Sequence, residues 1–184
     1  GDPVTRPMKH RVREAIFNLI STESEGRRVI DVFAGTGALG LEALSRGAVE
    51  ATFVERHVPT ARVVRENIES LAVQDRSTLV GASAFVWGKR DLPAFSLAST
   101  TPWLVFVSPP YAFFVDRQEE LLELIAALAR HSPVGSTLVV ESDNRFDVAL
   151  LDQALEADGR AEWKCDVRSY PPAVIAVCRK HGAE

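Results

Sequence analysis

The chain has 184 residues, of which 46% are hydrophobic and 25% are charged, and its formal net charge is -4 at pH 7. This length fits one domain with a well-buried core, and the net charge excludes a uniformly basic nucleic-acid coat while allowing a local basic patch. No apolar run reaches the roughly 20 residues that cross a bilayer, and the N-terminus lacks the charged-then-apolar order of a signal peptide. We therefore expect a single cytoplasmic domain over residues 1–184, with no membrane partner.

Predicted helices and strands alternate through the first half of the chain. Apolar residues recur at helical spacing from His10 to about Ile20, which predicts an amphipathic entry helix. The β-branched run over 28–33 predicts a strand, and the helix-forming stretch over 38–45 predicts the helix that follows it. The next expected elements are a strand over 51–55, a helix over 58–71 and a strand over 77–80.

The second half continues this alternation. The unbroken apolar run over 103–107 is typical of a strand that is buried on both faces, and the segment from Pro93 to Pro102 before it is a candidate surface loop. The elements expected after it are a helix over 117–130, a strand over 136–141, a helix over 148–157 and strands over 161–167 and 174–178. The last two are close enough in sequence to form an antiparallel hairpin. The whole pattern favours an α/β fold, with a mostly parallel sheet covered by helices on both faces.

A GxGxxG spacing lies between the first predicted strand and its helix, in the segment DVFAGTGALG over 31–40. Gly35 permits a tight turn, Gly37 lets a ligand approach the backbone, and Gly40 lets the helix pack closely on the strand. Glu55 closes the second strand, where it can accept hydrogen bonds from both ribose hydroxyls. The pattern predicts a nucleotide-like cofactor, and the alternative is that the glycines only build a turn. The expected cofactor-binding residues here are Asp31, Phe33, Ala34, Gly35, Thr36, Gly37 and Glu55.

Asp31 bears on which cofactor this is. A carboxylate at this turn repels a pyrophosphate but favours the ammonium of a methionine group, so S-adenosylmethionine is a better electrostatic match than a nicotinamide dinucleotide. The alternatives are a carboxylate that only accepts hydrogen bonds from turn amides and, for the whole protein, a nicotinamide-dependent oxidoreductase.

A second turn, Ser108-Pro109-Pro110-Tyr111, follows the buried strand over 103–107. A rigid turn with outward carbonyls can accept hydrogen bonds from an exocyclic amine, and Tyr111 can stack on a base for roughly 1–3 kcal/mol. These hydrogen bonds free the nitrogen lone pair to attack a sulfonium methyl, a transfer that depends on proximity and orientation more than on a strong base. We expect these four residues to hold the target amine, whereas Phe113 and Phe114 either wall the base pocket or anchor the next helix.

The N-terminal segment is basic against the acidic average of the chain. Its cationic residues either contact RNA phosphates or form a solvated helix face; they are Arg6, Lys9, Arg11 and Arg13. The metal-ligating residue types show no ligand spacing, so we expect no metal. The two cysteines, Cys165 and Cys178, are too few for a disulfide framework, and we expect both to be reduced thiols.

Four segments carry a family resemblance. They are RPMKHRVREAIFN over 6–18, DVFAGTGALGLEALSRGA over 31–48, Val54-Glu55 and Pro109-Pro110-Tyr111. Together they resemble the RsmD-type bacterial methyltransferases of small-subunit ribosomal RNA, and the resemblance covers nearly the whole chain. It implies a seven-stranded Rossmann-like sheet whose last strand is antiparallel. It also implies methyl transfer from S-adenosylmethionine to the N2 amine of a guanine, in 16S ribosomal RNA or in the assembling small ribosomal subunit.

This sequence departs from the family pattern at two amine-reading positions. Ser108 stands where the family usually has Asp, and Ser83 aligns best with an Asp that bonds the adenine amine. The chain begins at Gly1, so the family's RNA-holding N-terminal β-hairpin would lie before it. Two further alternatives therefore stay open: methylation of an adenine or cytosine amine, and an RNA-binding or ribosome-assembly module that has lost catalysis.

Overall fold

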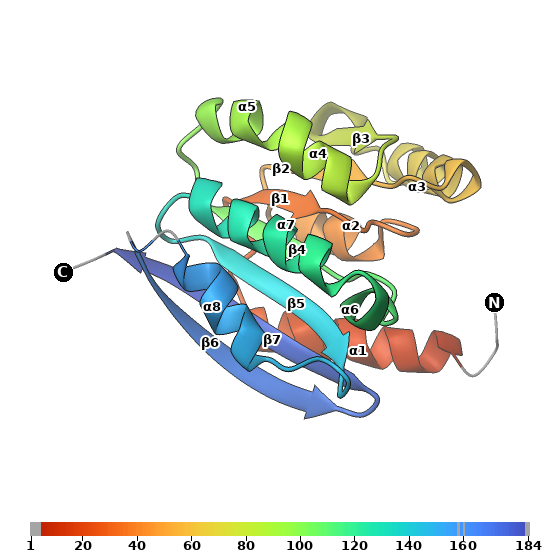
Figure 1. Cartoon of the computed structure of the whole chain (residues 1–184). Coiled ribbons are helices and arrows are strands. Elements are labelled where there is room, and N and C mark those ends of the chain that lie inside the picture. The colour runs from red at the N-terminus through yellow and green to blue at the C-terminus, as the bar shows by residue number, and fades with distance from the viewer. Residues whose placement is uncertain (1–4, 158, 160, 183–184) are drawn as a thin grey trace.

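The structure is a computed structural model that describes residues 5–157, 159 and 161–182, with side chains described from Lys9 onward in these ranges. Its strands form one sheet in the order β3-β2-β1-β4-β5-β7-β6 (Figure 1). Their bounds are β1 Arg28–Asp31, β2 Glu50–Val54, β3 Ser77–Val80, β4 Trp103–Val107, β5 Thr137–Asp143, β6 Ala161–Tyr170 and β7 Ala173–Gly182. Strands β1 to β5 are parallel, β7 is antiparallel to β5, and β6 is antiparallel to β7. The predicted α/β fold and its antiparallel last strand are confirmed.

Helices cover both faces of this sheet. Their bounds are α1 Thr5–Ile20, α2 Ala38–Ser45, α3 Val58–Ser70, α4 Ala84–Arg90, α5 Leu92–Leu97, α6 Phe113–Asp116, α7 Gln118–His131 and α8 Ala149–Glu156, with a short 3-10 turn at Gln74–Arg76. Helices α4 to α8 contribute to the hydrophobic cluster on one face, and α1, α2 and α3 to the cluster on the other. Figure 1 shows α4, α7 and α8 in front of the sheet.

Strand β4 shows why the sequences of the central strands are unbroken apolar runs. Its side chains alternate between the two faces, so Trp103, Val105 and Val107 join one cluster while Leu104 and Phe106 join the other. All five residues are buried. A strand covered on both faces has no polar side, and this burial fixes β4 at the centre of the sheet.

The segment from Pro93 to Pro102 was predicted as a surface loop, and this prediction is wrong over its first part. Helix α5 runs through it, with Pro93 in its first turn. The backbone N–H groups of a first turn have no intrahelical partner, so a proline there removes no hydrogen bond from the helix. Leu92 is fully buried, and the ring of Phe95 contacts the rings of Trp87 and Trp103. Tertiary packing of these apolar side chains holds a helix too short to show a periodic signal.

The expectation of two reduced thiols is also wrong, because Cys165 and Cys178 form a disulfide across the β6–β7 hairpin. The two residues are directly opposite in the antiparallel register, with their Cα atoms 4.0 Å apart. Counting cysteines along the sequence could not show this pairing, which depends on the hairpin register.

Candidate active site

The carboxyl ends of the parallel strands carry the residues that the sequence motifs indicate. In the register of the sheet, Asp31 of β1 lies opposite Phe53 of β2 on one side and opposite Phe106 of β4 on the other. The glycine turn follows β1, Glu55 follows β2, Ser83 follows β3, and the Ser108 to Tyr111 turn follows β4. Since carboxyl ends of parallel neighbours share one sheet edge, all four segments lie at the edge where open α/β sheets bind ligands.

Glycines build the turn between β1 and α2. Gly35 and Gly37 have φ values of 57° and 85°, in the left-handed region that favours glycine. A Cβ on Gly35 would meet no atom within 4 Å, whereas a Cβ on Gly37 would lie 3.3 Å from Val64 Cγ1 of α3. The open side of the turn is therefore at Gly35 rather than at Gly37. The predicted close packing at Gly40 is confirmed, because a Cβ there would overlap the buried ring of Phe53.

Asp31 lies under this turn and is 1% exposed. Its Oδ2 accepts a hydrogen bond of 3.2 Å from the Gly40 N–H, as the turn-amide alternative expected. Its Oδ1 is buried and has no hydrogen-bond partner among the described residues. Burial raises the pKa of Asp31 to about 7, and the charge of Glu55 adds to this rise, while the Gly40 hydrogen bond opposes it. A cation beside the free oxygen would stabilise the ionised carboxylate.

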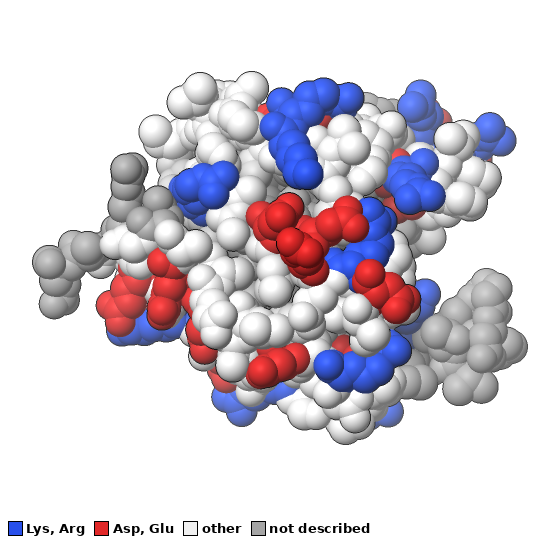
Figure 2. Space-filling model, viewed as in Figure 1, with Lys and Arg blue, Asp and Glu red and all other residues white. Residues whose placement is uncertain are grey.

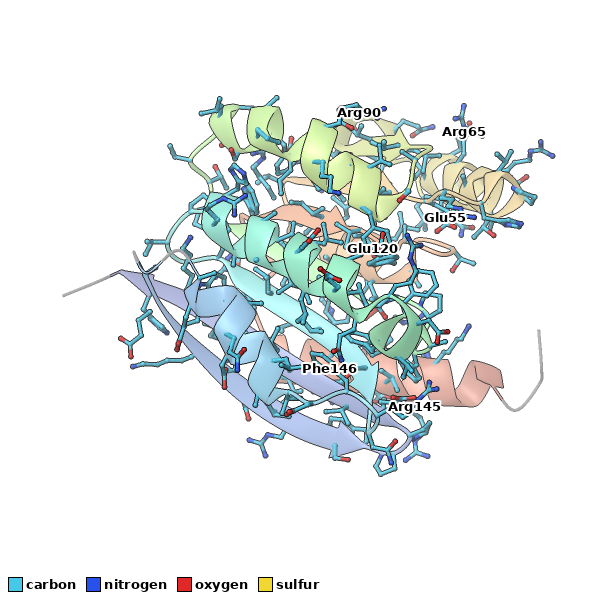
Figure 3. All side chains as sticks on the ribbon, viewed as in Figure 1. Glu55, Arg65, Arg90, Glu120, Arg145 and Phe146 are labelled. Atoms are coloured by element: carbon cyan, nitrogen blue, oxygen red, sulfur yellow. A yellow bond between two sulfur atoms is a disulfide. The ribbon has the colours of Figure 1, made fainter. Side chains whose placement is uncertain are left out.

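Glu55, labelled in Figure 3, connects β2 to the glycine turn. Its Oε2 accepts a hydrogen bond of 3.1 Å from the Gly35 N–H, and its Oε1 accepts one of 3.2 Å from the His57 N–H. Each oxygen of an ionised carboxylate has a second lone pair, so both can accept a further hydrogen bond from a ligand hydroxyl. The structure thus brings Glu55 into contact with the glycine turn, and its hydrogen bonds to ribose hydroxyls stay a prediction.

Ser83 caps helix α4. Its Oγ accepts a hydrogen bond of 3.2 Å from the Phe85 N–H, which satisfies one of the free amides at the start of this helix. The hydroxyl proton of Ser83 is left to donate. A serine followed by apolar residues is a helix-start signal, so α4 could have been found in the sequence.

Three phenylalanines connect the segments at this edge. Phe33 of the glycine turn, Phe85 of α4 and Phe113 of α6 lie with their ring centroids 5.8 to 6.3 Å apart. The guanidinium of Arg117 lies over this cluster, 4.3 Å from the Phe85 ring centroid. Phe114, in contrast, is buried against Phe146, so it anchors α6 in the core. The sequence motifs gave no signal for Phe85 or Arg117.

The proline turn is bound to strand β5. Ser108 Oγ donates a hydrogen bond of 2.5 Å to Glu141 Oε1, and the Tyr111 hydroxyl donates to Glu141 Oε2. Burial raises the pKa of Tyr111 above its usual value, and the hydrogen bond to Glu141 raises it further, so the phenol stays protonated. The carbonyls of Pro110 and Tyr111 accept hydrogen bonds from the first amides of α6, so these two are not the free acceptors that the motif predicted.

Sequence reasoning missed Glu141, which it placed only as the end of a strand. The available signal was an acidic residue closing an otherwise apolar run, TLVVE over 137–141. The fact that its carboxylate faces the Ser108 turn depends on the pairing of β4 with β5.

The basic N-terminal residues do not form one group. The side chain of Arg6 lies outside the described residues, Lys9 and Arg11 are exposed, and Arg13 contacts Glu42 of α2 at 3.7 Å. Arg11 lines a groove of about 370 Å³ between α1 and the turn of the β6–β7 hairpin, and Tyr170 and Pro171 line the same groove. This turn lies at the edge formed by the carboxyl ends of the parallel strands, called the active edge below, because Ala173 at the start of β7 pairs with Asp143 at the end of β5.

The surface over α7 has the opposite charge. Figure 2 shows acidic side chains gathered in the middle of the view, over the helix that carries Glu119, Glu120 and Glu123. Among the described residues, no cluster of three His, Cys, Asp or Glu side chains could hold a metal ion, and no helix is long and apolar enough to cross a membrane.

Comparison with known proteins places the chain in a family. A family model described as Conserved hypothetical protein 95 matches residues 2–158. “Putative rRNA methyltransferase YlbH” of Bacillus subtilis is 36% identical over 152 residues, which cover 83% of this chain and 74% of that protein. “Ribosomal RNA small subunit methyltransferase D” of Escherichia coli strain K12 is 36% identical over 109 residues, 59% of this chain and 51% of that protein.

A solved structure, “Putative methyltransferase yhhF from Escherichia coli”, superposes with a TM-score of 0.68 at 24% identity and covers 94% of this chain and 87% of that chain. It shows the same fold. On the family match and the Bacillus relative together, the chain belongs to the Conserved hypothetical protein 95 family, the RsmD-type family that its motifs indicate.

Proposed function

We propose that this protein is a cytoplasmic, single-domain methyltransferase that moves a methyl group from S-adenosylmethionine to the exocyclic N2 amine of a guanine in 16S ribosomal RNA. The main support is the convergence of the glycine turn, Glu55 and the Ser108 to Tyr111 turn at one sheet edge. Membership of the RsmD-type family and the names of the two relatives support ribosomal RNA as the substrate class.

The residues around the glycine turn fit S-adenosylmethionine. The unpartnered Oδ1 of Asp31 suits a cation, and the methionine part of this cofactor carries an ammonium. The turn is open at Gly35, so a ligand could lie against the backbone there, and Glu55 retains lone pairs for the ribose hydroxyls. The neighbouring residues Phe33, Ala34, Thr36 and Gly37 belong to the same proposed cofactor site. When bound, the cofactor supplies a methyl group on a positively charged sulfur.

The adenine would lie against the aromatic cluster. Phe33 and Phe85 offer apolar ring surface beside the glycine turn, and the hydroxyl of Ser83 can donate a hydrogen bond to a ring nitrogen. This assignment differs from the family's Asp, which accepts from the adenine amine. A serine that caps α4 retains one proton to donate and so reads the edge of the base by a different hydrogen bond.

The target base would lie at the proline turn. Tyr111 is half-buried, which leaves part of its ring for stacking, and Ser108 Oγ has lone pairs for an amine proton. Pro109 is buried and Pro110 is exposed, and the two prolines hold the backbone between Ser108 and Tyr111 rigid. Tyr111 and Ser108 can therefore align a planar base so that its amine lies beside the transferable methyl group.

The RNA would approach over α1. Lys9 and Arg11 are exposed and Arg11 lines the groove next to the hairpin turn, whereas the acidic surface over α7 would repel phosphates. Arg6 extends the same basic segment, and Arg13 contributes less because it contacts Glu42.

Mapping methylated nucleotides in ribosomal RNA from cells that lack this protein tests the proposal. We expect one guanine in 16S RNA to lose its N2 methyl group and to regain it when the gene is restored. An unchanged map contradicts 16S ribosomal RNA as the substrate. Loss of a methyl group from an adenine or a cytosine would identify that base, and not guanine, as the target.

Two in vitro measurements separate the remaining alternatives. Calorimetry with S-adenosylmethionine and with NADH distinguishes a methyltransferase from an oxidoreductase, and we expect heat only with the former. Tight RNA binding without transfer of tritium from labelled cofactor would indicate a binding module that has lost catalysis.

A further inference from the structure

The Ser108 turn has no carboxylate of its own, but one reaches it from the neighbouring strand. In the register of the sheet, Val107 of β4 pairs with Val140 of β5, so Ser108 and Glu141 follow side by side at the active edge. Both polar side chains of the turn donate to Glu141, Ser108 to one oxygen and Tyr111 to the other. A single carboxylate thus fixes both side chains that we assign to the target base.

The direction of these hydrogen bonds determines what Ser108 can do. An ionised carboxylate only accepts, so the Ser108 hydroxyl must donate its proton to Glu141 and keeps its lone pairs for another donor. A hydroxyl that donates to a carboxylate is also a stronger acceptor, because hydrogen bonds in a chain polarise one another. Ser108 is therefore held in the orientation that accepts a hydrogen bond from an amine N–H. An isolated serine hydroxyl could rotate and act as a donor instead.

We propose that Glu141 is the positioning carboxylate of the target-amine site and that it receives, through Ser108, the proton that the amine loses. This inference rests on the proposed function and adds a residue to it. Glu141 would provide from β5 the charge that the family's usual Asp provides at position 108. Ser108 and Glu141 together would then do the work of one acidic residue.

The proton balance of the step is complete with these groups. The amine nitrogen forms a bond to the methyl carbon while the carbon–sulfur bond breaks, and that electron pair stays on sulfur. The nitrogen, now positively charged, gives one proton to Ser108 Oγ as the Ser108 hydroxyl proton moves to Glu141 Oε1. Glu141 is only half-buried, so it can release the proton to solvent after the methylated base leaves.

The first test is Glu141→Gln, which keeps the size of the side chain but removes its charge. We expect kcat for RNA methylation to fall about 100-fold, which is typical of the loss of a proton acceptor, with no change in the affinity for S-adenosylmethionine. Glu123→Gln is the matched control, because Glu123 is exposed on α7 away from the turn, and it should leave kcat unchanged. An unchanged kcat in Glu141→Gln overturns the inference, and an equal loss of cofactor affinity overturns a positioning role.

A rescue experiment separates charge from structure. Ser108→Asp in the Glu141→Gln background places a carboxylate next to the amine, and we expect it to restore most of the lost kcat. The same substitution in the wild type places two carboxylates next to each other, and their repulsion disfavours the ionised form of both, so it should lower kcat there. A substitution that helps in one background and harms in the other is not expected from packing alone. Failure of the rescue in a folded double variant would contradict the shared-carboxylate role.

A third measurement needs no substrate. Tyr111 and Tyr170 are the only tyrosines of the chain, so in a Tyr170→Phe background the ultraviolet absorbance of the phenolate reports Tyr111 alone. Glu141→Gln should lower the pH at which Tyr111 ionises, because its hydrogen bond to the carboxylate and the negative charge of that group both raise its pKa. An unchanged titration would show that the Glu141 contact is absent. A wild type that transfers no methyl group to RNA overturns the proposed function, whereas an active wild type with a fully active Glu141→Gln overturns only this inference.

Discussion

At the scale of single residues, the ionised Asp31 carboxylate bears an electrostatic cost, because it is buried. One of its oxygens has no partner among the described residues, and its folded-state pKa is about 7. Structural carboxylates usually have hydrogen bonds to both oxygens, so an unsatisfied one at a ligand-binding edge indicates a functional constraint. This is the observation that supports the proposed role of Asp31 as the partner of a cation.

This cost predicts a pH dependence of stability. Because folding raises the pKa of Asp31 from 3.8 to about 7, the folded state holds this proton more tightly than the unfolded state. The corresponding stability is complete below pH 3.8 and is lost as the pH rises to about 7. We expect Asp31→Asn, which cannot ionise, to lose less unfolding free energy than the wild type over this range, as measured by denaturant titration.

The same variant should bind S-adenosylmethionine about tenfold more weakly, since it lacks the charge that attracts the ammonium. Asp152→Asn, at an exposed position on α8, is the control and should match the wild type in both measurements. Wild-type cofactor affinity in Asp31→Asn would show that Asp31 only supports the turn.

At the scale of elements, the packing of α2 on β2 sets the position of the glycine turn. The Cβ of an alanine at Gly40 would overlap the ring of Phe53, which is fully buried and cannot move aside. We expect Gly40→Ala to lower the free energy of unfolding by about 1–3 kcal/mol, the usual cost of overpacking a core. Phe53→Leu in the same chain should recover part of this loss by opening space. If the double variant were simply the sum of both losses, the close contact would not be the cause.

How much the sequence predicts also differs between elements. Strand β4 could be predicted because burial on both faces gives an unbroken apolar run. Helix α7 could be predicted because burial on one face gives apolar residues at helical spacing. Helix α5 was missed because six residues carry no periodic signal and its stability comes from Phe95 packed between two tryptophans. The Cys165–Cys178 disulfide and the Glu141 contact were missed for a related reason. The disulfide joins β6 to β7 and the Glu141 contact joins β5 to the turn after β4, and the spacing of residues along the sequence does not show which strands are neighbours.

At the scale of the whole molecule, charge is distributed unevenly despite the net value of -4. Acidic side chains gather over α7 (Figure 2). The exposed cationic residues Lys9 and Arg11 lie on α1, where Arg11 lines the groove next to the hairpin turn. A nucleic acid that reaches the Ser108 turn would therefore meet the positive surface of α1 and avoid α7.

Arg11 and Arg13 test this orientation because Arg11 is exposed and lines the groove, whereas Arg13 is partly buried. Arg13 contacts Glu42 at 3.7 Å, whereas no ion-pair partner of Arg11 occurs in the part of the chain that the structure describes. We expect Arg11→Ala to weaken RNA binding and to reduce the slope of log affinity against log salt by about one, the change that one lost phosphate contact produces. Arg13→Ala should change both quantities less, and neither variant should alter cofactor affinity, since neither residue has a hydrogen bond or ion pair to the glycine turn among the described residues. Equal effects of the two substitutions would mean that the general charge of the helix attracts RNA, and no effect of either would place the RNA on another face of the molecule.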